Sequence, residues 1–219
     1  MKYIIMCGGT YREWETPRHL TPIKGEPMIA RTIRLLREAG VSDISISSDN
    51  PVFEQFGVPV LRHENSYDAV DYHHVSGYWC DAFYPTDEPV CYIFGDVCFS
   101  PEAIRRIVDY ETDDIMFFGS KRPFAPNYPK KNVEPFAFKV ADPVHLRKAC
   151  EEFRKLDDSG TYWRKPIAWD LWFIICGQDP WEDLKNPINN SYIAINDYTC
   201  DIDKGTDVAK IYGVMDCIT

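Results

Sequence analysis

The chain has 219 residues, of which 45% are hydrophobic, and it carries a formal net charge of −10 at pH 7. This length suits one domain of moderate size that buries a substantial core. The acidic balance argues against broad binding to nucleic acid or to an anionic membrane surface, since both favour a basic face. A small basic pocket for phosphates is still compatible with the net negative charge, because a cleft concentrates electrostatic potential locally.

The first half of the chain alternates predicted strands and helices. Strands are predicted at 2–7, 43–48, 58–61 and 88–94, and helices at 27–39, at about 67–83 and from 101 onward. In the 27–39 helix the apolar residues share one face and Gly40 follows the end, while Ser100 and Pro101 are a typical helix start. This alternation predicts a parallel sheet covered by helices on both faces.

The second half is less regular. Strands are predicted at 114–118, 133–140 and 192–195, helices at 143–155, 168–176 and 206–212, and a Pro- and Lys-rich loop lies between 120 and 132. The eight cysteines show no C-x-x-C spacing, which favours reduced thiols in a cytoplasmic protein. No stretch approaches the ~20 apolar residues that span a membrane, so no membrane insertion is expected. The oligomeric state is not predicted.

A glycine turn with nearby basic residues follows the first predicted strand. The strand ends at Cys7, the turn is Gly8-Gly9-Thr10, and Arg12 and Arg18 come shortly after it. Exposed backbone N–H groups together with arginine side chains suit a polyphosphate. A glycine pair alone marks many ordinary turns, so the turn by itself indicates little.

Acidic residues stand at two further places where predicted strands end. Asp96 follows the apolar strand Val90–Phe94, where a carboxylate can bind Mg²⁺ or can simply cap a turn. Alternation places Asp201 and Asp203 on the same face of an extended segment, where two carboxylates repel unless a cation compensates. A solvated strand end is the alternative for that pair. Since ligands bind beyond the carboxyl ends of parallel strands, the glycine turn and Asp96 are expected in one site.

The order of these features resembles the N-terminal signature of nucleotidyltransferases that make activated sugars, choline and related head groups. The matching residues are the strand, Gly8-Gly9, Arg12, Pro17-Arg18, Leu20 and Gly25-Glu26-Pro27-Met28-Ile29. Cys7 stands where that family usually has Ala, and Arg18 stands where it usually has Lys. The resemblance is close over the first 50 residues, good over 90–104 and moderate over 192–208.

The resemblance implies a three-layer α/β/α sandwich with a mostly parallel, Rossmann-like sheet of the glycosyltransferase-A type. It implies one domain over 1–219, with a nucleotide-binding half at 1–118 and an acceptor-binding half at 119–219. The implied catalytic residues are Arg12, Arg18 and Asp96. The implied nucleotide contacts are Cys7, Gly8, Gly9, Thr10, Arg12, Arg18, Asp49 and Ser76. Mg²⁺ is expected on Asp96 and Asp203, with Asp201 as a second candidate.

Acceptor contacts are expected in the aromatic second half. The candidates are Glu134, Trp163, Lys165, Trp169 and Asp170. An aromatic box with a carboxylate would suit a quaternary ammonium such as choline, and a sugar would stack on an aromatic face. Plain core packing is the alternative for the tryptophans.

The activity that the resemblance implies is Mg²⁺-dependent transfer of NMP from an NTP to a phosphorylated small molecule, with release of pyrophosphate. CTP is the expected co-substrate. Phosphocholine, another phospho-amine or amide and a sugar 1-phosphate are the expected acceptors, in cell-surface polysaccharide (capsule) or head-group biosynthesis. One rival is a glycosyltransferase of the same fold, although Asp96-Val97-Cys98 lacks the D-x-D motif of such enzymes. The other rival is a nucleotide sensor without catalysis.

Overall fold

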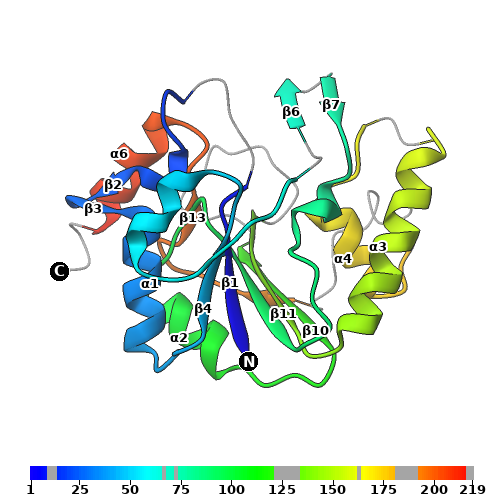
Figure 1. Cartoon of the computed structure of the whole chain (residues 1–219), viewed down its shortest axis with the longest axis horizontal. Coiled ribbons are helices and arrows are strands. Elements are labelled where there is room, and N and C mark those ends of the chain that lie inside the picture. Colours follow the sequence, from blue (N-terminus) through cyan, green and yellow to red (C-terminus); the bar gives the residue numbers. More distant parts are fainter. Residues whose placement is uncertain are drawn as a thin grey trace.

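The computed structural model describes residues 1–8, 14–65, 68–71, 74–120, 134–161, 164–180 and 192–215, and for 68–71 and 74–76 it describes the backbone alone. A sheet that contains β1, β4, β10 and β11 forms its centre (Figure 1). The sheet has seven strands in the order β12-β10-β11-β8-β1-β4-β5. These strands are β1 (Lys2–Met6), β4 (Ile44–Ser47), β5 (Val60–Leu61), β8 (Val90–Phe94), β10 (Ile115–Ser120), β11 (Glu134–Val140) and β12 (Ile193–Ala194).

The sheet is mostly parallel. Strands β8, β1, β4 and β5 run parallel to one another, and β12 runs parallel to β10. Strand β11 is antiparallel to both β8 and β10. The carboxyl ends of β1 and β8 therefore lie side by side, with Met6 opposite Phe94.

Helices cover both faces of the sheet, because side chains alternate along each strand. Tyr3 and Ile5 of β1 belong to a core cluster shared with α1 (Met28–Glu38) and α2 (Pro101–Asp109). Ile4 and Met6 belong to the opposite cluster, shared with α3 (Pro143–Asp158) and α4 (Ala168–Ile175). Figure 1 shows the two helix pairs on either side of the sheet. The predicted three-layer α/β/α fold with a mostly parallel sheet is confirmed.

Local capping explains where the helices begin. Ser100 is the N-cap of α2, and its hydroxyl accepts a hydrogen bond from the Ala103 N–H. Asp142 caps α3 in the same way, accepting from the N–H groups of Val144 and His145. A proline occupies the first turn of each of these helices, where its missing N–H costs nothing.

The helix predicted at about 67–83 is wrong. The backbone there forms a hairpin of β6 (Asp68–Asp71) and β7 (His74–Ser76), followed by the short 3-10 helix η3 (Trp79–Ala82). Gly77 between them has a φ of 69°, a left-handed conformation that interrupts a right-handed helix. The apolar and aromatic residues of the segment at about 67–83 fit a strand as readily as a helix over so short a stretch. Ser76 accordingly ends a strand instead of lying on a helix.

The C-terminal segment returns to the N-terminal part of the chain. Helix α6 (Gly205–Met215) buries Ile211 and Met215 in a small cluster with Ile23, Met28 and Ile202. In Figure 1, α6 (red) lies beside the hairpin of β2 (Pro22–Ile23) and β3 (Glu26–Pro27) (blue). The packing carries the acidic segment at 201–203 back to the start of the chain. No helix in the described ranges is both long enough and apolar enough to cross a bilayer.

Candidate functional site

The site begins where β1 and β8 end. The Gly95 N–H donates to the Met6 carbonyl at 3.0 Å, so the chain leaving β8 stays against the end of β1. A Cβ on Gly95 would lie 2.7 Å from the Cys7 sulfur, 2.9 Å from Cδ2 of His19 and closer still to the Met6 carbonyl oxygen. Only glycine allows this approach. It fixes Asp96 immediately beyond the end of β1.

A second pair of strands brings in the late acidic segment. Strand β9 (Val97–Cys98) pairs antiparallel with β13 (Cys200–Asp201), and the Ile202 N–H donates to the Asp96 carbonyl at 2.9 Å. Asp203 follows one residue later, in a bend beyond the strand. The structure thus brings Asp96 and Asp203 together. Asp201 lies opposite Val97 in the strand register.

Arg18 joins the two carboxylates. It lies in the 3-10 helix η1 (Arg18–Leu20), and its guanidinium forms ion pairs with both aspartates. One nitrogen contacts Oδ1 of Asp203 at 2.7 Å, and the other contacts Oδ2 of Asp96. Arg18 is only 6% exposed, whereas the side chains of Asp96 and Asp203 are 18% and 39% exposed. The site therefore consists of two partly exposed carboxylates that are both paired with one buried arginine.

Two residues that the sequence analysis did not single out support this cluster. The Trp14 indole N–H donates to the Asp203 carbonyl at 3.1 Å, which holds the bend in place. His19 lies beside Gly95 and packs edge-to-face on Phe53. Burial lowers the pKa of His19 to about 4, although the negative charge of Asp96 opposes the effect. The imidazole is thus neutral near pH 7. The sequence alone does not indicate a role in the site for Trp14 or His19.

Of the residues expected to contact the nucleotide, Cys7 and Gly8 directly follow β1, and Asp49 lies just beyond β4. Burial, reinforced by the charge of Asp96, raises the pKa of the Cys7 thiol well above its usual range, which excludes a thiolate there. Gly8 follows it, with the side chain of Asn65 close by. The Ser48 hydroxyl donates to the Cys7 carbonyl at 3.0 Å, while the neighbouring Asp49 is exposed. Gly9, Thr10 and Arg12 lie outside the described residues, and so does the side chain of Ser76.

The acceptor candidates are dispersed. Trp169 is buried against Phe117 in the core, with the two rings 5.1 Å apart. Asp170 is 1% exposed; it forms a two-point ion pair with Arg164 and accepts a hydrogen bond from the Ile167 N–H at the start of α4. These contacts are structural, and a substrate role for either residue stays a prediction.

The other acceptor candidates lie at different points of the chain. The Lys165 amine pairs with Asp157 at 2.9 Å. Glu134 begins β11, where it lies opposite Ser120. Trp163 lies outside the described residues. Roles for all three in acceptor binding stay predictions.

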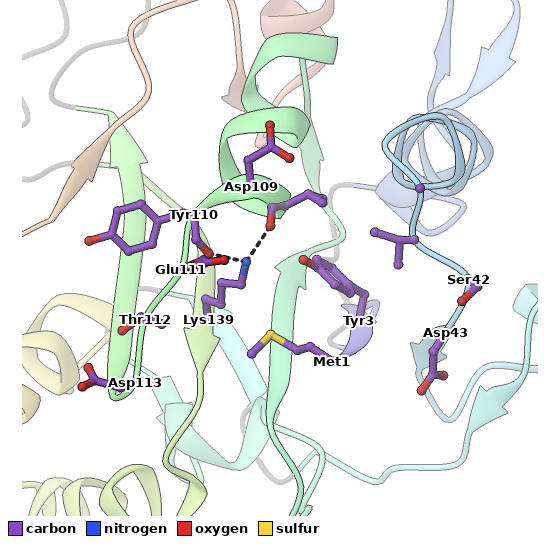
Figure 2. Close-up of a pocket in the computed structure, with 13 residues that line it drawn as sticks. Met1, Tyr3, Ser42, Asp43, Asp109, Tyr110, Glu111, Thr112, Asp113 and Lys139 are labelled. Carbon is purple, nitrogen blue, oxygen red and sulfur yellow. Dashed lines mark hydrogen bonds between the residues drawn. The ribbon is translucent and has the colours of Figure 1, made fainter.

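A broad open cavity lies at the opposite end of the strands from Asp96, near the amino end of β1 (Figure 2). Its lining includes Met1, Tyr3, Asp43 and Lys139. The Lys139 amine donates to three main-chain carbonyls at the end of α2, those of Ile107, Val108 and Tyr110, at 2.6–2.9 Å. The lysine ammonium thus satisfies backbone carbonyls at the C-terminal end of α2. Because ligands of such sheets bind at the carboxyl ends, the site at Asp96 is the stronger candidate.

Within the described residues, no group of three or more histidine, cysteine, aspartate or glutamate side chains is placed to hold a metal ion. The candidate metal site consists of the two carboxylates on Arg18. This number suits a cation that completes its shell with water and substrate phosphate oxygens, as Mg²⁺ does.

Comparisons with known proteins identify a family and solved structures of similar fold. The profile of the MobA-like NTP transferase domain matches residues 3–164. The inositol-1-phosphate CTP transferase from T. maritima is similar in structure, with a TM-score of 0.57 and 14% identity over 99% of this chain and 95% of that one. A protein from Bacillus anthracis, assigned as a glucose-1-phosphate thymidylyltransferase and solved with sucrose, has a TM-score of 0.50 and 17% identity over 97% and 94%. No curated protein sequence matches the chain.

Proposed function

The chain belongs to the family of MobA-like NTP transferase domains, and from that premise we propose that it transfers CMP from CTP to a phosphorylated small molecule. The nucleotidyltransferase activity follows from the family. The base, the metal and the acceptor are the proposal. Pyrophosphate is the second product.

The observation that carries the proposal is the meeting of Arg18, Asp96 and Asp203. These residues come from three distant parts of the chain. The close packing at Gly95, the pairing of β1 with β8 and the pairing of β9 with β13 bring them together. A carboxylate pair beyond the carboxyl ends of parallel strands suits a nucleotide with its metal ion.

The donor set fits a divalent cation. Oxygens of Asp96 and Asp203 already converge on one positively charged group, the guanidinium of Arg18. Hard carboxylate oxygens are the ligands that Mg²⁺ prefers. Asp96 and Asp203 would hold Mg²⁺, which would supply positive charge to the phosphates when bound.

The reaction that we propose needs positioning more than proton transfer. An acceptor phosphate oxygen bonds to the α-phosphorus of the NTP, the bond from that phosphorus to the bridging oxygen breaks, and pyrophosphate leaves. The acceptor phosphate is already an anion near neutral pH, so no general base is needed. The neutral, buried His19 and the protonated Cys7 agree with this. Arg12, Arg18 and the Gly8 backbone would orient the phosphates and stabilise the negative charge that develops on them.

CTP is the first choice of nucleotide on two grounds. The N-terminal signature resembles the choline-type branch of the nucleotidyltransferases, and one structural neighbour is named as a CTP transferase. We place the acceptor among phosphocholine-like compounds, other phospho-amines and amides, and sugar or polyol 1-phosphates. The product would enter cell-surface polysaccharide or head-group synthesis, in the cytoplasm.

The test is pyrophosphate release with Mg²⁺, measured for four NTPs against a panel of phospho-acceptors. Asp96→Asn should lower the rate by a factor on the order of 10³ while the melting temperature stays near that of the wild type. Asp113→Asn, an exposed carboxylate outside the site, is the matched control and should keep the full rate. An active Asp96→Asn enzyme would refute the site. Binding of NTP without turnover across the panel would favour a sensor, and hydrolysis of a nucleotide sugar would favour a glycosyltransferase.

A further inference from the structure

We propose that Cys80 and Cys150 form a site of reversible oxidation, at which hydrogen peroxide converts their two thiols into one disulfide. Both cysteines are free thiols in the structure. They stand 70 positions apart in the sequence, Cys80 in η3 and Cys150 in the middle of α3. The inference goes beyond the proposed function, because it depends on neither the nucleotide nor the acceptor.

The fold brings these two thiols into contact. Sγ of Cys80 lies 4.0 Å from the main-chain carbonyl oxygen of Cys150, and the two side chains form a hydrogen bond with each other. Thiols that touch in the folded protein meet the proximity that a disulfide requires. Core packing explains a single buried cysteine, but it does not require two cysteines from distant segments to face each other.

One arginine holds the segment of Cys80 against the helix of Cys150. Arg154, one turn after Cys150 on α3, forms an ion pair with Asp81 at 2.7 Å. It also lies over the ring of Tyr78, with 5.7 Å between the guanidinium carbon and the ring centroid. Tyr78 and Asp81 stand on either side of Cys80 in the sequence. Their contacts with Arg154 therefore keep the Cys80 thiol beside Cys150 before any bond forms.

The two thiols differ in reactivity. The hydrogen bond with the Cys150 thiol lowers the pKa of Cys80 against the effect of burial, and the positive charge of Arg154 lowers it further. The same hydrogen bond, together with burial, raises the pKa of Cys150. Since the thiolate is the nucleophile, Cys80 is the thiol that attacks the peroxide, and Cys150 is the thiol that completes the disulfide.

A small cavity gives an oxidant access to the pair. The cavity has a volume of about 260 Å³, and its lining includes both cysteines, Phe83 and Tyr84 after η3, and Leu146 of α3. The two cysteines are only 2% and 7% exposed. A molecule as small as hydrogen peroxide can reach thiols of such low exposure through the cavity, whereas a bulky oxidant such as glutathione disulfide cannot.

The reaction balances with one peroxide and no further reactant. The Cys80 thiolate attacks one peroxide oxygen, the O–O bond breaks, and hydroxide leaves and takes up a proton, which gives one water and a sulfenic acid on Cys80. The Cys150 sulfur then attacks the Cys80 sulfur and the S–O bond breaks. The departing hydroxide takes the Cys150 proton as a second water. The two thiols lose two electrons, and a dithiol reductant restores them by exchange.

The chain contains a second pair of neighbouring cysteines that serves as an internal control. Cys98 and Cys200 lie opposite each other across the pairing of β9 with β13. Burial raises the pKa of Cys98 to about 11 and raises the pKa of Cys200 well above its usual range. Neither residue is therefore a thiolate near neutral pH. Proximity without a reactive thiolate should leave this pair reduced.

The experiment treats the full chain with hydrogen peroxide at neutral pH, quenches it with acid, alkylates the remaining thiols in denaturant and maps the peptides by mass spectrometry. We expect two peptides joined through Cys80 and Cys150, which dithiothreitol separates, while Cys98 and Cys200 are alkylated. The bridge closes a loop of 70 positions, so the oxidised protein should melt roughly 4–16 °C higher than the reduced protein.

Three variants test the assignment. Cys80→Ser and Cys150→Ser should each lose both the joined peptides and the rise in melting temperature. Cys200→Ser removes one member of the control pair and should keep both. Cys80→Ala or Cys150→Ala serves where the serine variant does not fold.

Four results would overturn the inference. One is that both thiols stay open to alkylation under conditions that oxidise Met1, which is 49% exposed. The second is oxidation of Cys80 to a sulfinic acid without a bridge, and the third is a bridge between any other two cysteines. The last is a bridge between Cys80 and Cys150 that does not raise the melting temperature, because the native structure would then not accommodate it.

Discussion

Gly95→Ala tests the contact that fixes Asp96. The new methyl group would lie 2.7 Å from the Cys7 sulfur and 2.9 Å from the His19 ring, and nearer still to the Met6 carbonyl oxygen. Two of these neighbours are buried side chains and the third is backbone inside a strand pair, so none can yield freely. Overpacking of this kind costs about 1–3 kcal/mol. For a domain of this size the melting temperature should fall by roughly 2–12 °C.

The rate should fall further than the stability explains. A backbone shift that relieves the clash moves Asp96, and a displacement of about 1 Å in a site can cost about 100-fold in rate. The assays are thermal unfolding and pyrophosphate release at a temperature where both proteins are folded. Gly205→Ala is the control, since a Cβ there meets nothing within 4 Å. A Gly95→Ala protein that melts with the wild type and the control would refute the reasoning.

Three further predictions concern neighbouring features. The folded pKa of His19 lies below its unfolded value of 6.5, so the stability that this residue contributes is full above that pH and is lost toward pH 4. His19→Phe should remove up to about 3 kcal/mol of the stability loss between pH 7 and 4, measured by urea unfolding. Lys139→Met should destabilise the fold by about 1–3 kcal/mol in the same assay, because three carbonyls lose their donor, and kcat should stay unchanged. Asp170→Asn should lower the melting temperature and leave the acceptor KM unchanged if its pairing with Arg164 is structural; a raised KM alone would show an acceptor contact.

The layers of the fold were predictable because local signals and the global arrangement agree. The apolar run before Gly8 and the run before Asp96 indicate neighbouring buried strands, and the cap at Ser100 indicates a helix start. Both signals depend on residues close together in the sequence. The hairpin at 68–76 escaped the same reasoning, because short mixed runs fit two periods and the final choice depends on tertiary packing.

The site was only partly predictable for a related reason. Resemblance pointed to Asp96 and Asp203, but their meeting depends on the pairing of β9 with β13, which joins distant segments. The bridging role of Arg18 depends on the same pairing. Nothing in the sequence distinguishes an acceptor-binding Asp170 from one that caps a helix and pairs with a partly buried arginine. That distinction requires the burial and the partners of the side chain.

The central claim is that Asp96 and Asp203 act as one unit in nucleotidyl transfer. The most direct test is pyrophosphate release by Asp96→Asn, Asp203→Asn and the double variant, with the NTP and acceptor that the panel identifies. Each single variant should lose a factor on the order of 10³ in rate, and the double variant should be little worse than either. A near-wild-type rate for Asp203→Asn, or losses that multiply in the double variant, would contradict it.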